Sequence, residues 1–246
     1  MHSPVRAPIP VETLLLAYRS GIFPMADARE DTEVFWVEPR DRAIIPLEGL
    51  HISKSLRKAI RQDRFAVTLN RDFEHVIRAC SEPRPGHEQS WISERIVASY
   101  LELHRSGHAH SVECWKRPDS DSPDWVSDTT PELVGGLYGV SFDRVFCGES
   151  MFSLADNASK IALAWLVAMM RRADFKLLDC QFMTDHLATL GAVEMPQKAY
   201  LKLVREARGE TRLSLQQAYG QFTQDEGGGL YASPGKLIAQ SFTQTS

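Results

Sequence analysis

The amino-acid sequence predicts an α+β fold in which a mixed β-sheet is flanked by helices, and three observations support this. Short segments of alternating apolar residues, such as residues 65–69, are typical of strands. Longer segments repeat apolar residues every three or four positions, and the strongest, residues 156–172, is apolar nearly all round and predicts a central helix. The composition, with 43% hydrophobic and 24% charged residues, is that of a globular protein with room for one large domain or two modest ones.

Residues 1–62 predict a small N-terminal domain. Three prolines within the first ten residues indicate an extended arm, and a short helix is predicted over residues 11–20, ending at Gly21. Residues 51–60 predict an amphipathic helix with Ser53 as its N-cap.

Basic residues gather mainly on one side of this second helix: Lys54, Arg57, Lys58 and Arg61. They could form a solvated face, or they could contact the phosphates of an RNA backbone. The net charge of −4 and the pI near 6.1 exclude a protein that coats nucleic acid non-specifically, because such binding depends on neutralising many phosphates. Any contact with nucleic acid should therefore be local.

Residues 63–208 predict a larger domain, and residues 209–246 predict a polar tail that is poorly ordered. The expected elements of the larger domain, in chain order, are a strand at 65–69, helices at 72–80 and 94–106, a strand at 108–115, a loop at 116–131, a hairpin at 132–153, a helix at 156–172, a strand at 176–182, a short helix begun by Thr184, a strand at 192–195 and a helix at 199–208. From residue 100 onward this order resembles the GCN5-related acetyltransferase fold, although element order alone fixes neither substrate nor chemistry.

The strand predicted at 176–182 holds candidate catalytic residues. Its period of two places Asp179 and Gln181 on one face, and Leu178 and Cys180 on the other. A carboxylate within an apolar strand costs free energy unless it has a partner. Asp179 belongs either to a structural hydrogen-bond network or to a functional acid–amide pair in a cleft of the sheet.

The segment that precedes the central helix contains a further candidate, Glu149, between small residues. The neighbouring Cys147 lacks the motif of a thiol nucleophile and an evident histidine partner. The following turn lacks the glycines and the basic residue with which acetyltransferases bind the pyrophosphate of coenzyme A, and Asp156 would repel phosphate. These features argue against a CoA-dependent N-acetyltransferase, and no cofactor is expected.

No metal site is expected either. The four cysteines stand far apart without a C-x-x-C pair and are expected to be reduced thiols. His108 and His110 share a strand face, but no third ligand is evident. No signal peptide is apparent, and no stretch approaches the roughly 20 apolar residues of a membrane helix. We therefore expect a cytoplasmic protein, a monomer, with neither a membrane nor DNA as partner.

Short motifs between residues 20 and 205 together resemble the leucyl/phenylalanyl-tRNA–protein transferase family. The matching segments are 21–25, 35–40, 50–55, 68–73, 91–92, 107–113, 134–140, 146–153, 157–160, 179–181 and 190–192. Each is weak alone, but Phe-Cys-Gly-Glu-Ser-Met-Phe-Ser followed later by Asp-Cys-Gln is specific.

This resemblance implies a small N-terminal domain packed on an acetyltransferase-like domain. It also implies transfer of Leu, Phe or Met from aminoacyl-tRNA to a protein that begins with Arg or Lys, which marks that protein for degradation. By position, Asp179 and Gln181 match the catalytic pair, Glu149 lines the same site, and Trp36 and Trp115 match aromatic residues near the terminal adenosine. The residues that match the aminoacyl pocket are Leu137, Leu163, Leu166, Met170 and Leu178.

The sequence departs from the family in its long loop at 116–131, in Thr184, which stands where the family often has Asn, and in the tail. Two further alternatives remain beside the acetyltransferase. The overall acidity and the Asp179/Gln181 pair argue against a non-catalytic RNA-binding module. A transferase that adds amino acids to cell-wall precursors would suggest a membrane-facing basic surface, which the sequence does not indicate.

Overall fold

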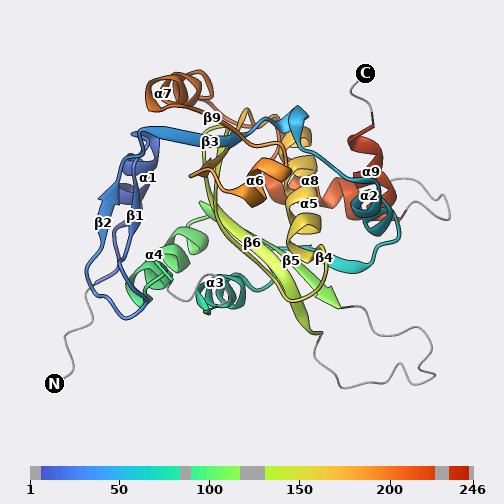
Figure 1. The fold of residues 1–246 in the computed structure, drawn as a ribbon, viewed down its shortest axis with the longest axis horizontal. Coiled ribbons are helices and arrows are strands. Elements are labelled where there is room, and N and C mark those ends of the chain that lie inside the picture. Colours follow the sequence, from blue (N-terminus) through green and yellow to red (C-terminus); the bar gives the residue numbers. More distant parts are fainter. Residues whose placement is uncertain (1–6, 84–89, 117–130, 225–232, 244–246) are drawn as a thin grey trace.

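A seven-stranded mixed sheet forms the centre of the computed structural model, which describes residues 7–83, 90–116, 131–224 and 233–243 (Figure 1). The strands lie in the order β4-β5-β6-β7-β8-β3-β9. Their bounds are β4 (Phe65–Leu69), β5 (Ala109–Lys116), β6 (Leu133–Phe142), β7 (Val145–Ser153), β8 (Leu177–Gln181), β3 (Asp41–Ile45) and β9 (Val193–Pro196). A separate two-stranded sheet pairs β1 (Phe23–Met25) with β2 (Phe35–Val37).

Helices cover both faces of the main sheet, and each face has its own apolar core. One face carries α5 (Ala158–Ala173), with α2 (Lys54–Arg61), α8 (Leu215–Thr223) and α9 (Pro234–Ser241) around it. The other face carries α1 (Val11–Arg19), α3 (Phe73–Ser81), α4 (Glu94–Arg105) and α7 (Gln197–Glu206). The short α6 (Asp185–Thr189) follows β8. The central helix predicted at 156–172 is α5, and nearly all of its residues are buried.

From α4 to β9 the elements follow the order that the sequence predicted after residue 100. Among the described strands, β7 and β8 form the only parallel pair, and their pairing is short. It joins residues 145–147 of β7 to residues 177–179 of β8. Beyond this point β7 continues to Ser153 without a partner in β8, so the centre of the sheet opens between the two strands.

Helix starts agree with the local sequence. Ser53 caps α2 and Thr184 caps α6, each accepting a backbone N–H bond at 3.2 Å. Asn157, in a left-handed conformation, occupies the N-cap position of α5, but the Ser153 hydroxyl accepts the Ser159 backbone N–H at 3.3 Å, as a cap would. None of the helices that the structure describes is long and apolar enough to cross a membrane.

The expected domain boundary at residue 62 is wrong, because β3 lies inside the main sheet. No strand is predicted from the sequence at residues 41–45, which stand between Pro39 and Pro46. In the structure this segment inserts between β8 and β9 and pairs antiparallel with both. The segment contains only three apolar residues, which are too few to show a period. Its partner strands, β8 and β9, lie more than 130 residues away in the chain.

The expectation of a poorly ordered tail is wrong for the tail residues that the structure describes. Helix α8 starts at a capping box formed by Ser214 and Gln217, and α9 starts at Ser233. The buried residues of these helices are Leu215, Ala218, Phe222, Gly235, Ile238 and Ala239. The tail is polar on average, but its few apolar residues recur at helical spacing and cover α5 and α2.

Substituting Ile238 by alanine should therefore lower the free energy of unfolding by roughly 2–4 kcal/mol, because the fully buried side chain would leave a cavity. Chemical denaturation of the full chain measures this effect. Lys236→Ala, on the exposed side of the same helix, is the matched control and should change stability little. Equal stability of the two variants would contradict the packing of α9.

Candidate functional site

Asp179 is fully buried in the middle of β8, and its carboxylate accepts four hydrogen bonds from Arg42, Tyr200 and Gln181. Arg42 binds it in a bidentate manner, with Nε 2.8 Å from Oδ1 and Nη2 2.6 Å from Oδ2. The Tyr200 hydroxyl donates to Oδ2 at 3.1 Å, and the backbone N–H of Gln181 donates to Oδ1 at 3.0 Å. These partners offset the cost of burying the charge.

Arg42 ties together elements that are distant in the sequence. Its side chain is also fully buried, and Nη1 donates to the carbonyl oxygen of Gly21 at 2.9 Å. The guanidinium lies over two aromatic rings, 4.9 Å from the centroid of Phe23 and 4.5 Å from that of Tyr200. The ion pair thus fixes β8 relative to β3, α7 and the N-terminal segment.

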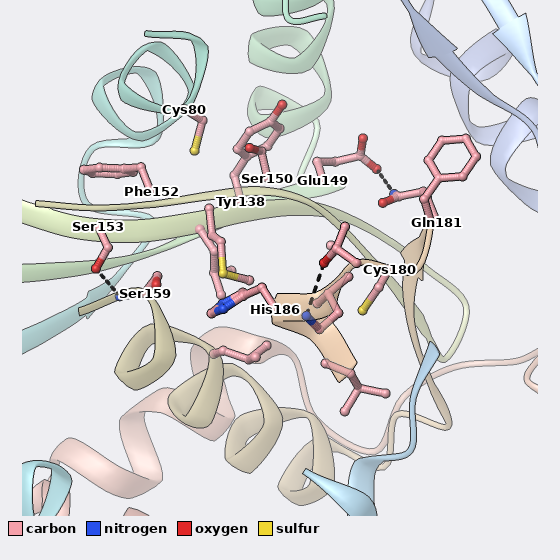
Figure 2. Close-up of a pocket in the computed structure, with 18 of the residues that line it drawn as sticks. Cys80, Tyr138, Glu149, Ser150, Phe152, Ser153, Ser159, Cys180, Gln181 and His186 are labelled. Carbon is pink, nitrogen blue, oxygen red and sulfur yellow. Dashed lines mark hydrogen bonds between the residues drawn. The ribbon is translucent and has the colours of Figure 1, made fainter. Parts of the chain in front are cut away.

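Gln181 ends β8 and lines a cavity (Figure 2). Its φ of +57° is left-handed, which costs a non-glycine residue about 1–3 kcal/mol and persists only where the surroundings enforce it. Here the bond from its backbone N–H to Asp179 helps to hold the conformation. The side-chain Nε2 donates to Glu149 Oε1 at 3.0 Å, so the two residues act as a carboxyl–amide pair. The strand predicted to reach Phe182 ends at this turn.

Glu149 is buried beneath α1 and α4. The Tyr18 hydroxyl lies 2.8 Å from Oε1 and the Tyr100 hydroxyl lies 3.1 Å from Oε2, while the two hydroxyls also contact each other. Burial raises the pKa of Glu149 from 4.5 to about 8; the hydrogen bond from Tyr18 opposes this shift and the charge of Asp179 adds to it.

The raised pKa of Glu149 predicts how stability depends on pH. Between about pH 4.5 and 8 the folded protein holds a proton that the unfolded chain releases, so the free energy of unfolding should fall as pH rises. The contribution is fully present below pH 4.5 and is lost as pH rises through about 8. Urea unfolding across this range should show a slope in wild type that is steeper by up to about 1.4 kcal/mol per pH unit than in Glu149→Gln. Parallel curves would show that Glu149 titrates as in the unfolded chain.

A cavity of about 730 Å³ occupies the opening between β7, β8 and α5. Its polar part contains Glu149 and Gln181, and Figure 2 shows these side chains pointing toward each other. Four of the five leucine and methionine residues that the sequence predicted for the aminoacyl pocket line its apolar part: Leu137, Leu163, Leu166 and Leu178. Met170 is fully buried and does not line the cavity, because it lies one helical turn beyond Leu166.

Three other predicted site residues do not line the cavity. Asp179 lies behind Gln181 and reaches the cavity only through that residue. Trp36 lies on β2 with 44% of its surface exposed. Trp115 is buried at 5% exposure, where its indole N–H donates to Thr68. Among the cavity residues the tryptophan is Trp91, which belongs to one of the family-like segments.

The four basic residues of α2 lie outside the cavity on the solvent side of that helix. Leu56, Ala59 and Ile60 form its buried side. Among the residues that the structure describes, no carboxylate is within ion-pair distance of Lys54, Arg57, Lys58 or Arg61. These positive charges are therefore available to an external partner.

Sequence reasoning missed Arg42, Tyr18, Tyr100 and Tyr200. Their polar atoms contact residues that are distant in the chain, and no motif in the neighbouring sequence indicates their role. The one available signal was Asp179 itself, whose position required a buried partner of opposite charge.

His108 and His110 both contact polar atoms of Ser141. His110 is buried and contacts Asn70 and Ser141 at 3.0 and 3.1 Å, and burial lowers its pKa to about 4. Among the described residues, no group of three His, Cys, Asp or Glu side chains could hold a metal ion. The loop expected at 116–131 falls almost entirely outside the described residues. Thr184, besides capping α6, lines the cavity.

Comparisons with known proteins bear on the class of this chain. A model of the leucyl/phenylalanyl-tRNA protein transferase N-terminal domain matches residues 8–40, and the model of the leucyl/phenylalanyl-tRNA protein transferase matches residues 44–205. A protein of Novosphingobium aromaticivorans is 51% identical, and the match covers 97% of each chain. One from Zymomonas mobilis is 53% identical, over 79% of this chain and 68% of the relative. Both relatives are named leucyl/phenylalanyl-tRNA–protein transferase.

Among solved structures, L-PGS from Bacillus licheniformis is similar with a TM-score of 0.36 and 14% identity, over 72% of this chain and 55% of that one. This likeness is too low to support an argument.

The fold, the cavity and these relatives define an aminoacyltransferase. More particularly, the chain belongs to the leucyl/phenylalanyl-tRNA–protein transferase family, as its motifs indicated. The two family models meet between residues 40 and 44, at the start of β3, which agrees with the place of β3 in the main sheet.

Proposed function

We propose that this protein transfers Leu, Phe or Met from aminoacyl-tRNA to the N-terminal Arg or Lys of acceptor proteins in the cytoplasm, which marks them for degradation. One observation carries the proposal: in a chain of this family, a single cavity joins an apolar region to a buried carboxyl–amide pair. The apolar region receives the aminoacyl side chain, and the pair receives the amine that attacks it.

The lining of the apolar region suits unbranched or γ-branched side chains. Leu137, Leu163, Leu166 and Leu178 present flexible methyl groups and no polar atoms. Such a surface discriminates by only ~1–3 kcal/mol per methylene, so the preference among Leu, Phe and Met should be modest. Trp91 lies in the same cavity, while Trp36 and Trp115 remain the aromatic residues proposed to lie near the terminal adenosine.

The reaction is the aminolysis of an ester. The acceptor's α-amine nitrogen attacks the ester carbonyl, the C–N bond forms, and the C–O bond to the tRNA ribose breaks. The nitrogen loses a proton, and the ribose oxygen gains one and becomes a hydroxyl again. An α-amine has a pKa of about 7.7–8, so a fair fraction is neutral without help, and positioning can supply most of the acceleration.

Gln181 and Asp179 have different parts in this mechanism. Nε2 of Gln181 is bound to Glu149, and no described residue donates to its Oε1, which leaves that oxygen to accept a hydrogen bond from the attacking amine. Asp179 holds the backbone of Gln181 in place. The charge of Asp179 is already paired with Arg42, so attraction of the cationic acceptor residue is assigned to Glu149.

The basic side of α2 is proposed to contact the acceptor stem of the tRNA. Replacing Lys54, Arg57, Lys58 and Arg61 together by alanine should raise the apparent KM for aminoacyl-tRNA by about tenfold or more and weaken its salt dependence, because phosphate contacts are lost. The control removes four exposed basic residues elsewhere: Lys198, Lys202, Arg205 and Arg208. The same KM for both variants would remove α2 from the tRNA surface.

The deciding experiment for the proposed function is transfer of labelled Leu from Leu-tRNA to a peptide that begins with Arg. We expect label on this peptide and none on a matched peptide that begins with Glu. The Gln181→Ala variant should lose most of the transfer. Absence of transfer from every charged tRNA tested would refute the proposal, and acyl-CoA donors would then be screened.

A further inference from the structure

Glu149, Tyr18 and Tyr100 form a triangle of mutual oxygen contacts. The Tyr18 hydroxyl is bonded to Oε1 of Glu149, the Tyr100 hydroxyl to Oε2, and the two hydroxyls to each other. Three such contacts need three hydrogens, and each phenol supplies one. If Glu149 is ionised, one contact brings two oxygen atoms together without a hydrogen between them.

A protonated Glu149 supplies the third hydrogen. Its O–H donates to Tyr100, Tyr100 donates to Tyr18, and Tyr18 donates to the other carboxyl oxygen, which closes a ring. Gln181 Nε2 donates to that same carboxyl oxygen, which has a second lone pair for it. All four contacts are then satisfied at once.

The charges around Glu149 also favour its protonated form. The titratable and charged groups that face it are Tyr18 of α1, Tyr100 of α4, Tyr138 of β6, Cys147 of β7, and the pair of Asp179 and Arg42 on β8 and β3. The positive charge of Arg42 already balances that of Asp179 in their bidentate pair. An ionised Glu149 would therefore add an uncompensated negative charge to a buried site.

We propose that Glu149 is uncharged in the free protein and ionises when the cationic N-terminal residue of an acceptor enters the cavity, so that one proton leaves for each acceptor bound. This inference rests on the acceptor class of the proposed function. In this step the O–H bond of Glu149 breaks, the proton passes to water, and the two tyrosines both donate to the carboxylate. The arriving cation supplies the charge that the buried site lacked.

The coupling gives the site a means of selecting acceptors. Binding of a cationic residue stabilises the ionised carboxylate of Glu149. This stabilisation offsets the loss of the ring of hydrogen bonds among Glu149, Tyr18 and Tyr100. A neutral or acidic residue offers no such stabilisation, and Glu149 keeps its proton. Selection would thus come from an electrostatic change in the site as well as from its shape.

The proton on Glu149 can be observed directly in the full-length protein with 13C-labelled glutamate carboxyl groups. We expect one carboxyl resonance of the free protein to titrate with a midpoint above about pH 7, well outside the ordinary glutamate range. This resonance should be missing in Glu149→Gln. Glu149→Asp provides a second assignment, since it also removes the label but keeps a carboxyl group. Titration of every glutamate near its ordinary range would overturn the inference.

The second arm tests the coupling below that midpoint, with deacylated tRNA present so that no transfer occurs. A saturating peptide that begins with Arg should move the Glu149 resonance to its ionised position, and a peptide that begins with Glu should leave it unchanged. A resonance that the Arg peptide does not move would refute the coupling. The free-protein titration needs no substrate, so failure of the proposed function would appear separately, as missing transfer of Leu.

Discussion

Replacing Arg42 by methionine should lower the free energy of unfolding by about 3–5 kcal/mol, because it leaves the carboxylate of Asp179 buried without its counter-ion. The two side chains have no exposed surface, so solvent cannot compensate for the loss. Urea denaturation measures the change. The neighbouring Arg40→Met is the matched control; Arg40 is exposed, and its replacement should have little effect.

A double substitution separates the charge from the packing. In Arg42→Met/Asp179→Leu no unpaired charge remains, so we expect this variant to recover much of the stability that Arg42→Met lost. If the double variant were as unstable as the sum of the single variants, the ion pair would not be the reason for the effect. Even where Arg42→Met folds, transfer should be weak, since Asp179 would no longer hold the backbone of Gln181 in one place.

Replacing Gln181 by glycine should change activity and stability in different directions. Transfer, measured as kcat/KM, should fall by about 100-fold or more, because the amide that positions the amine is lost. Stability should not fall, since glycine relieves roughly 1–2 kcal/mol of left-handed strain at a φ of +57°, against a lost hydrogen bond to Glu149 worth about 1 kcal/mol.

The control for Gln181→Gly is Asp143→Gly in the turn between β6 and β7. Asp143 also has a positive φ, of +49°, but it lies outside the cavity, and it forms an ion pair with Arg19 at the surface. We expect this variant to keep full transfer activity. A large loss of stability in Gln181→Gly, or normal transfer by it, would show that the side chain of Gln181 serves the fold and not the reaction.

Much of this protein follows from short-range features of its sequence. Ser53 and Thr184 cap the helices they were expected to cap, and α5 and the β6–β7 hairpin lie where the periodicity placed them. The period of two on β8 also places Asp179 with Gln181, both directed away from the α5 side, where Leu178 packs. These features depend on residues within a few positions of each other, so they can be predicted from a single sequence.

The sequence motifs predicted more about this protein than the hydrophobic periodicity did. They identified the family, and four pocket leucines taken from the resemblance line the cavity. The motifs did not predict which other residues line the cavity. Trp91 lines it, whereas Trp36, Trp115 and Met170 do not.

Only the tertiary structure decided how Asp179 and Glu149 are kept in a buried site. The partner of Asp179 is Arg42, which lies 137 residues away in the chain, on a strand that the sequence did not reveal. Two partners of Glu149, Tyr18 and Tyr100, come from α1 and α4, 131 and 49 residues away. The sequence by itself determined that Asp179 needs a partner, because burying a charge is costly. It could not name that partner, because such pairs arise from the order of strands in the sheet and the packing of helices on it, which local patterns do not encode.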